Sequence, residues 1–455
     1  MLIEIAFVLA TSVVGLPATE VSGVPEVHFS SIVTSDAPAP FVGPVVDTTG
    51  ALSGSAVGTS TFSGRTLTAL ASIPTSGIAE YLAARPGTVE QILSAQPPAQ
   101  EVALWWGDLA IDRQEALEVA SPQLLGNLEG VPYTIRDVSN RTVLDETIAE
   151  LNSVANSDAG RAVQQSARQQ LSMLSSISEA LVFDSSNPER TLVTLDVTGQ
   201  GRAAIVLGDL NDADYVSFLV PGMFFTIEGQ MSFWADAANT LYTEQQAWLE
   251  LFDSQSVFTS NETVATVAWI GYDTPNLTNV GAIDNAVQGR DTLANAILGL
   301  QAQRGADQPY ISVVAHSYGT TAAMMALSEY DFDIDALAMV GSPGSPAESV
   351  ADLNVRDGNV FVGEAAWDPI PNSSYFGADP GTATFGAHSL GVNGGFDVLQ
   401  KQELAGSVGH NEYFTPGSEA MRNFALMCIG RGDLVIPEDA SVVARAIGST
   451  AHDQS

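Results

Sequence analysis

A single pentapeptide, residues 315–319 (AHSYG), could carry nucleophilic chemistry. It follows the apolar run 310–315 and opens a stretch rich in Ala and Met, which is the strand-turn-helix context of a nucleophile elbow. The turn is tight, so the residues two before and two after the serine must be small. Ala315 and Gly319 meet this condition, although Ala315 stands where glycine is more usual. Because the turn presents its hydroxyl beside the N–H groups that begin the helix, we predict that Ser317 is a nucleophile.

A serine nucleophile needs an acid and a histidine, which follow it in that order in chains that carry a nucleophile elbow. Asp368 comes at the exit of an expected strand over 359–365, and active sites in open α/β sheets lie at the carboxyl ends of strands. Pro369 stops further pairing and stiffens the loop. Asp352 and Asp357 precede the strand, which would place them at the wrong end of the sheet. We therefore predict Asp368 as the acid, with an ordinary Asp-Pro turn as the alternative.

The chain has five histidines, and their positions separate their roles. His410 lies just before an expected last helix over 416–429, where the base of such an enzyme belongs, so we predict it as the general base. His388 lies in a glycine-rich loop and is expected at its rim. His316 neighbours the nucleophile, but adjacent side chains on a tight turn diverge, so it is expected to support the turn.

The remaining parts of the predicted site are an oxyanion hole and an acyl pocket. The N–H groups of Met223, after the apolar run 215–220, and of Tyr318 are the expected oxyanion donors. The stretch between Asp368 and His410 is longer than an ordinary connection and mixes aromatic residues with glycines. Part of 371–409 could form a mobile cover over the acyl site, or its aromatics could simply pack on the domain. The predicted substrate-binding residues are Phe224, Phe376 and Phe385.

The elements that would position these residues alternate between strand and helix from about residue 190. Apolar strands spaced by helices predict a mostly parallel α/β sheet with helices on both faces. We expect strands at 191–197, 202–207, 215–220, 264–270, 310–315, 336–341 and 359–365, and helices at 228–252, 286–304, 318–330 and 416–429. We expect four regions: an irregular N-terminal region 1–75, a helical segment 76–185 packing on the catalytic domain, the catalytic domain itself at 186–432 and a tail 433–455.

Taken together, these motifs resemble those of an alpha/beta-hydrolase family that is common in actinobacteria and was long catalogued as a domain of unknown function. The resemblance covers roughly residues 100–430 and rests on FLVPGM (218–223), AWIGYDTP (268–275), VVAHSYGTT (313–321), MVGSPG (339–344) and GHNEYFTPGSEAMRN (409–423), with WWGDL (105–109) and GNLEGVPYTIRDVSNR (126–141) upstream. It implies an alpha/beta-hydrolase fold preceded by a helical segment. It also implies Ser317 as nucleophile and His410, rather than His388, as base.

The amino-acid composition excludes some classes of binding partner. The chain has 53 acidic and 16 basic residues and a net charge of −37, which repels nucleic acid and disfavours adsorption to anionic membranes. Cys428 is the single cysteine, so no intrachain disulfide can form. The apolar residues 5–16 are too short to span a bilayer and lack a basic start, so we expect no integral membrane segment and slightly favour the cytoplasm over secretion.

The function expected from these residues is cleavage of a carboxylic ester by a Ser-Asp-His catalytic triad through an acyl-enzyme. The substrate would be a small-molecule ester or acyl compound, and the chemistry requires no metal or organic cofactor. Two alternatives remain: an amidase or peptidase that uses the same triad, and a non-catalytic hydrolase-fold binding module. The sequence identifies no protein partner.

Overall fold

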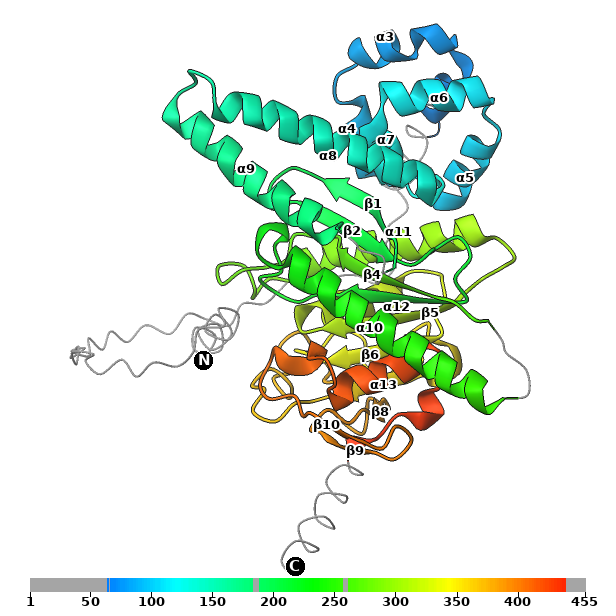
Figure 1. Ribbon diagram of the computed structural model, residues 1–455, viewed down its shortest axis with the longest axis vertical. Helices are drawn as coiled ribbons and strands as arrows, with labels where there is room; N and C mark the ends of the chain where they lie inside the picture. Colours follow the sequence, from blue (N-terminus) through cyan, green and yellow to red (C-terminus); the bar gives the residue numbers. More distant parts are fainter. Residues whose placement is uncertain (1–63, 65, 183–187, 257–260, 439–455) are drawn as a thin grey trace, which may run out of the picture.

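The computed structural model describes residues 64, 66–182, 188–256 and 261–438 (Figure 1). The predictions for the N-terminal region through residue 63 and for the tail beyond residue 438 therefore lie outside the described residues. The chain is already helical at residues 66–72, before residue 76, where the sequence pattern first looked helical. Leu67 and Leu70, one helical turn apart, are both buried there.

Short helices with a small core of their own form the first part of the helical segment, at the top of the molecule in Figure 1. They are η1 (Thr75–Gly77), α3 (Ile78–Ala83), α4 (Thr88–Ala95), α5 (Ala99–Gly107), α6 (Ile111–Ala120) and α7 (Pro122–Asn127). Two long antiparallel helices then lead down to the sheet, α8 (Tyr133–Ala155) and α9 (Arg161–Ala180). Leu124 and Leu125 of α7 are fully buried, so α7 belongs to the centre of this small core.

One eight-stranded sheet forms the centre of the molecule, in the order β1-β2-β4-β3-β5-β6-β7-β8. Its strands are β1 (Arg190–Asp196), β2 (Arg202–Leu207), β3 (Tyr215–Val220), β4 (Val264–Ile270), β5 (Tyr310–His316), β6 (Ala336–Val340), β7 (Val360–Gly363) and β8 (His388–Ser389). The pairs β1–β2 and β2–β4 are antiparallel, and every later pair is parallel. A separate antiparallel ribbon joins β9 (Gly395–Asp397) to β10 (Gln402–Leu404).

Helices cover both faces of the sheet, which confirms the predicted fold class (Figure 1). One face packs against α9, α10 (Ile227–Gln255) and α13 (Glu419–Cys428), and the other against α11 (Asp284–Arg304) and α12 (Tyr318–Glu329). Alternation along β5 explains the two cores, since Val314 belongs to the first and Val313 to the second. The connections contain η2 (Val350–Asp352), η3 (Arg356–Gly358), η4 (Glu412–Phe414) and η5 (Gly432–Leu434).

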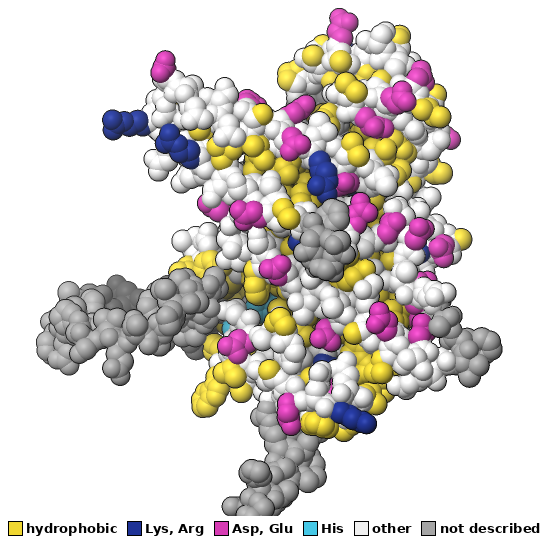
Figure 2. All heavy atoms as spheres, in the orientation of Figure 1, with side chains coloured by type: hydrophobic (Ala, Val, Ile, Leu, Met, Phe, Trp, Pro, Cys, Tyr) yellow, Lys and Arg dark blue, Asp and Glu magenta, His cyan; other side chains and the backbone are white. Residues whose placement is uncertain are grey.

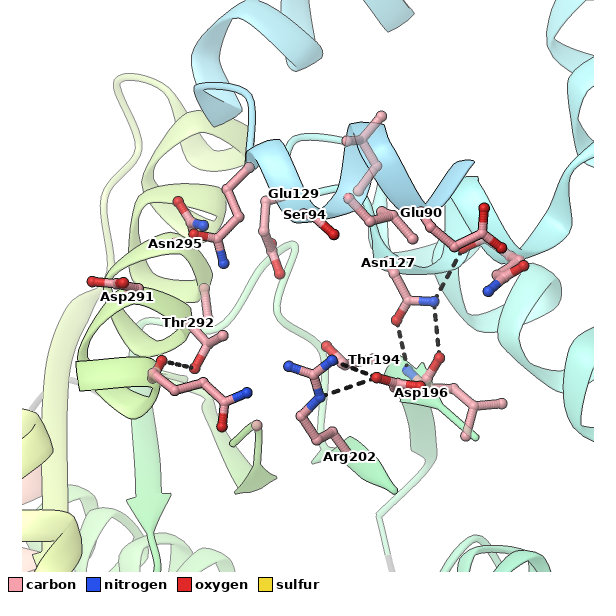
Figure 3. Close-up of a pocket in the computed structure, with 18 of the residues that line it drawn as sticks. Glu90, Ser94, Asn127, Glu129, Thr194, Asp196, Arg202, Asp291, Thr292 and Asn295 are labelled. Carbon is pink, nitrogen blue, oxygen red and sulfur yellow. Dashed lines mark hydrogen bonds and ion pairs between the residues drawn. The ribbon is translucent and has the colours of Figure 1, made fainter. Parts of the chain in front are cut away.

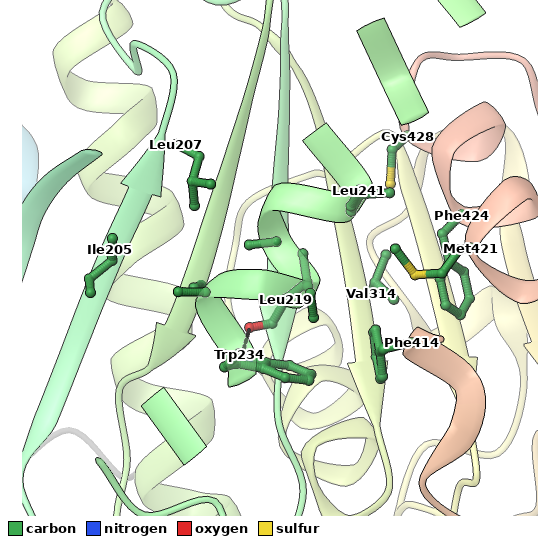
Figure 4. Packing of buried hydrophobic residues seen from close by; sticks show 14 of the residues in the cluster. Ile205, Leu207, Leu219, Trp234, Leu241, Val314, Phe414, Met421, Phe424 and Cys428 are labelled. Carbon is green, nitrogen blue, oxygen red and sulfur yellow. Dashed lines mark hydrogen bonds between the residues drawn. The ribbon is translucent and has the colours of Figure 1, made fainter. Parts of the chain in front are cut away.

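The first core is built around large side chains of α10 and α13 (Figure 4). Trp234 is fully buried, and its indole Nε1 donates a hydrogen bond of 3.1 Å to the carbonyl oxygen of Leu219 on β3. Cys428 is also fully buried in this cluster, and burial raises the pKa of its thiol to about 11. The thiol therefore stays protonated and acts as an apolar core group.

The helical segment is joined to the sheet by polar side chains that satisfy the free edge of β1. Asn127 accepts from the Leu195 N–H at 2.8 Å and donates to the Leu195 carbonyl at 2.9 Å. Asp137 accepts from the Leu192 N–H at 2.6 Å, and Asn140 donates to the Leu192 carbonyl at 2.9 Å. An edge strand leaves such groups unpaired, so α7 and α8 take the place of a further strand.

Acidic side chains are spread over the face of the molecule seen in Figure 2, on the helical segment and on the region below it, with few basic ones between them. Across the described part of the chain, no helix combines the length and the apolar character that crossing a bilayer would require.

Candidate active site

A strained turn at the carboxyl end of β5 presents Ser317. Its backbone has φ 55° and ψ −130°, a region that L-residues rarely adopt, and it lies between His316, which ends β5, and the first residue of α12. A β-carbon on Gly319 would overlap the carbonyl oxygen of Pro221, and one on Gly222 would lie 2.5 Å from Ser317 Cβ. Glycine at both positions is therefore a steric requirement of this turn.

The structure brings Ser317, His410 and Asp368 into one hydrogen-bonded chain. His410 Nε2 lies 2.7 Å from Ser317 Oγ, and His410 Nδ1 lies 2.9 Å and 3.0 Å from the two carboxylate oxygens of Asp368. A carboxylate only accepts, so Nδ1 carries the proton and Nε2 is free to accept from the serine hydroxyl. Both Ser317 and His410 are 4% exposed, so water competes little for these bonds.

Asp368 is held as a carboxylate by its neighbours. Burial alone would raise the pKa of this group, but hydrogen bonds from His410, from the Tyr413 hydroxyl and from the Ile370 N–H together lower the pKa below its ordinary value of 3.8. Tyr413 Oη donates to Asp368 at 2.6 Å and accepts from the Ala365 N–H at 2.9 Å. Sequence reasoning gave Tyr413 no role, although it lies one turn beyond His410 in GHNEY.

His316 contacts the backbone of the predicted base. Its Nε2 lies 2.7 Å from the carbonyl oxygen of His410, so Nε2 carries the proton and donates it. Burial, reinforced by the nearby charge of His410, lowers the pKa of His316 to about 3. The rings of Phe225, Tyr413 and Phe414 surround it. A neutral His316 therefore packs like an aromatic core residue while fixing the chain at His410.

The predicted oxyanion donors lie on the two segments that meet at Ser317. Tyr318 begins α12, and Met223 follows Gly222, the residue packed against Ser317. Among the described residues, neither N–H donates a hydrogen bond to another group, so both are available to a ligand. Their roles remain predictions.

The three predicted substrate-binding aromatics lie in different surroundings. Phe224 adopts φ 62° and packs with Met223, Val280 and Ile370 in a small apolar cluster, which adjoins the second main core through Val280. Phe376 is half-buried, with its ring 5.2 Å from that of Tyr318.

Phe385, in contrast, lies in the core and is 2% exposed. Its carbonyl accepts from the Val350 N–H at 2.9 Å. The structure thus gives Phe385 a packing role, which competes with its predicted part in substrate binding.

The long stretch between Asp368 and His410 is tied to the domain along its length. Ala378 and Ser345 exchange backbone hydrogen bonds of 2.8 and 3.1 Å. Further on, the carboxylate of Asp397 pairs with Arg422 at 3.0 Å, and both side chains are buried. These contacts favour a fixed surface over the mobile cover, the alternative that the sequence left open.

His388 is not part of the triad geometry. It lies on the edge strand β8 rather than in a loop, it is exposed, and its ring is 5.4 Å from that of Phe361 on β7. Asp352 also lies elsewhere, where its carboxylate caps η2. In the described ranges, no group of three His, Cys, Asp or Glu side chains is arranged to hold a metal ion.

Comparison with known proteins finds a family model that matches part of the chain, and several relatives. Residues 196–378 match a model described as alpha/beta hydrolase. An uncharacterized protein of Mycobacterium tuberculosis (strain H37Rv) is 26% identical over 392 residues, which cover 76% of this chain and 58% of that protein. The chain therefore spans less than two thirds of that relative's length. An uncharacterized protein of Mycobacterium bovis is 26% identical over 217 residues, 46% of this chain and 79% of that protein.

Solved structures of similar chain path include an esterase of Pyrobaculum calidifontis, with 14% identity and a TM-score of 0.29, covering 67% of this chain and 97% of that one. Another is the carboxylesterase EstE1 from a metagenomic library, with 14% identity and a TM-score of 0.29, covering 60% and 98%.

Proposed function

We propose that this chain, a member of the alpha/beta hydrolase family, is a serine hydrolase that cleaves carboxylic esters through an acyl-enzyme. The observation that carries the proposal is the unbroken hydrogen-bonded chain from Ser317 through His410 to Asp368, at the carboxyl end of the sheet. A surface serine would have no base within reach, whereas this one has an acceptor nitrogen 2.7 Å away.

The reaction follows from the positions of the protons. As Ser317 Oγ attacks the carbonyl carbon, its proton passes to His410 Nε2, and the Asp368 carboxylate stabilises the imidazolium that forms. The carbonyl oxygen gains negative charge and is stabilised by the N–H groups of Met223 and Tyr318. His410 then protonates the departing alcohol, which leaves an ester of Ser317. Water repeats the two steps, releases the acid and restores the serine.

The apolar cluster beside the oxyanion loop supports an acyl group with a hydrocarbon chain. Met223, Phe224, Val280 and Ile370 pack together there, and Ile370 follows Asp368 by two residues. Phe224 and Val280 are only partly buried, so each keeps apolar surface that a ligand can cover. This surface fits an alkyl chain better than it fits the charged or polar side chains of a peptide.

The test compares the cleavage of ester bonds with that of amide bonds, in the wild type and in two variants. p-Nitrophenyl esters from acetate to dodecanoate and the matching p-nitroanilides are offered to the wild type, to Ser317→Ala and to Ser312→Ala. Ser312 is a matched control because it is a buried serine of β5, the strand that leads to Ser317, and is hydrogen-bonded to Ser217 at 3.0 Å. We expect ester turnover by the wild type and the control only.

Faster cleavage of anilides than of esters would replace the proposal by an amidase or peptidase. Equal rates in the wild type and Ser317→Ala would exclude the triad mechanism.

A further inference from the structure

A large cleft lies between the helical segment and the sheet, apart from the triad. Its volume is about 580 Å³, within the range of small-molecule sites, and no triad residue lines it. Its walls come from α4, α7, the β1–β2 hairpin, the end of β4 and α11, as Figure 3 shows. Ser94, Glu129 and Asn295 reach into it from one side in that view and Arg202 from the other.

Most charges on the walls of the cleft are already paired, and the exception among the described residues is Glu90, which is exposed. Asp196 binds the guanidinium of Arg202, with Nε at 3.1 Å. Glu129 accepts from Arg136 at 2.7 Å, and Asp291 lies 2.6 Å from Arg290. Arg202 is the basic residue of the described lining, so a phosphate or carboxylate would have to displace Asp196. The cleft therefore favours a neutral ligand.

Several uncharged polar groups of the same walls have no partner among the described residues. The amide of Asn295, the hydroxyl of Ser94 and the amide of Gln123 make no side-chain hydrogen bond to another described residue. Gln288 accepts from the Asp273 N–H at 2.8 Å through Oε1, which leaves its Nε2–H groups free. Amides and hydroxyls both donate and accept, as do the hydroxyls of a polyol.

Apolar groups lie between these polar ones. Leu93 and Ala296 are half-buried residues of the lining, and Trp269, which is only 2% exposed, also borders the cleft. A ring that carries hydroxyls at its rim and C–H groups on its faces matches such a mixed wall. We propose that this cleft binds a neutral carbohydrate, as a site separate from the catalytic one.

A pair of aromatic rings separates the two sites. Trp269 stacks on Tyr272 with ring centroids 5.9 Å apart, and Tyr272 Oη donates to the Pro221 carbonyl at 2.7 Å, beside the predicted oxyanion loop. Binding in the cleft therefore requires no triad residue, and its test is independent of the proposed hydrolase activity.

The experiment is saturation-transfer NMR with the full chain. The neutral probes are maltotriose and triacetylchitotriose, and the charged probes are glucose 6-phosphate and spermidine. Asn295→Leu removes a free amide, and Ser94→Trp fills the cleft from its exposed side. Asn152→Leu is the matched control, because Asn152 is exposed on α8 and outside the lining.

We expect at least one neutral probe to bind the wild type, Ser317→Ala and Asn152→Leu equally. Asn295→Leu and Ser94→Trp should each weaken this binding about tenfold or more, because each removes a contact or the space itself. Thermal unfolding of each variant shows that it is folded.

Binding of a charged probe alone, binding that survives both cleft variants, or no binding of either neutral probe at millimolar concentration would overturn the proposal.

Discussion

The carboxyl edge of the sheet and the cleft below the helical segment use polar side chains in opposite ways. At the edge, Ser317, His410, Asp368 and Tyr413 bind one another in a continuous chain. In the cleft, Asp196 and Arg202 bind each other, but amides such as that of Asn295 have no partner among the described residues. A closed chain fixes one geometry, whereas free groups accept a ligand from outside.

The edge that carries the triad also contains strained backbone. Ser317 and Trp367, the residue before Asp368, have φ values of 55° and 65°, which strain any residue other than glycine, and Gly341 has a φ of 61°. A β-carbon on Gly341 would lie 2.9 Å from His410 Cε1 and 3.0 Å from Asp368 Oδ2. Strain of this kind persists only where the surroundings enforce it. We therefore expect large, non-additive effects of substitution at the edge and small, separable effects elsewhere.

The largest expected effect is that of His410→Ala. The nucleophile and the base of a triad act as a unit, so removal of either costs on the order of a million-fold in kcat. His388→Ala is the matched control, because His388 is exposed on β8. Ester turnover of purified, folded variants measures both. An active His410 variant beside an inactive His388 variant would reverse the assignment.

Asp368→Asn should have the second-largest effect. We expect kcat to fall about ten thousand-fold, because the amide favours the wrong tautomer of His410. Its circular dichroism should match that of the wild type. Asp357→Asn is the matched control, since Asp357 is exposed in η3. A near-normal rate for Asp368→Asn would mean that another acid orients His410.

His316→Gln should change the pH dependence of stability, because Gln keeps a donor toward the His410 carbonyl but does not titrate. The folded-state pKa of His316, about 3, lies below its ordinary value of 6.5, so the unfolded chain binds the proton more readily. Stability is then lost as the pH falls below 6.5 and unaffected above it. From pH 7 to pH 5 the wild type should lose about 2 kcal/mol more than the variant.

Urea unfolding at the two pH values measures this difference. Equal losses in wild type and variant would show that His316 is not buried in its neutral form.

The smallest effect concerns Phe376 and Phe385, which differ in burial. Phe376→Ala should alter the ratio of hexanoate to acetate turnover by about tenfold, the lower end of the range for one methylene in a hydrophobic pocket. Phe385→Ala should leave this ratio unchanged and lower the free energy of unfolding by about 3–5 kcal/mol. A changed ratio for Phe385→Ala but not for Phe376→Ala would mean that the acyl pocket lies beside Phe385 rather than beside Phe376.

The sheet and its helices could be predicted because their apolar residues recur with the period of each element. Strand 264–270 was predicted with the bounds of β4. The apolar period is interrupted in the first half of α8, which begins at Tyr133. Arg136 and Asn140 are buried there, because they bind backbone of α7 and Asn140 also binds β1. Polar residues buried for their hydrogen bonds break the apolar pattern.

The sequence also predicted the three residues of the candidate triad. The strand-turn-helix context indicated Ser317, the exit of a strand indicated Asp368, and the position before the last helix indicated His410. The sequence could not find Tyr413, because a hydroxyl that supports a carboxylate 45 positions away in sequence leaves no local signal. Nor could it place Phe385 in the core, since aromatics in a glycine-rich stretch fit a cover and a packed loop equally well.

The proposed hydrolase activity depends above all on activation of Ser317 by His410. Treatment of the full chain with a fluorophosphonate, followed by peptide mass spectrometry, reads out that activation without any assumption about the substrate. We expect one adduct, on Ser317, that forms at least a hundredfold more slowly in His410→Ala, because general-base assistance is worth about that much or more. Labelling of a different serine, or equal labelling rates with and without His410, would contradict it.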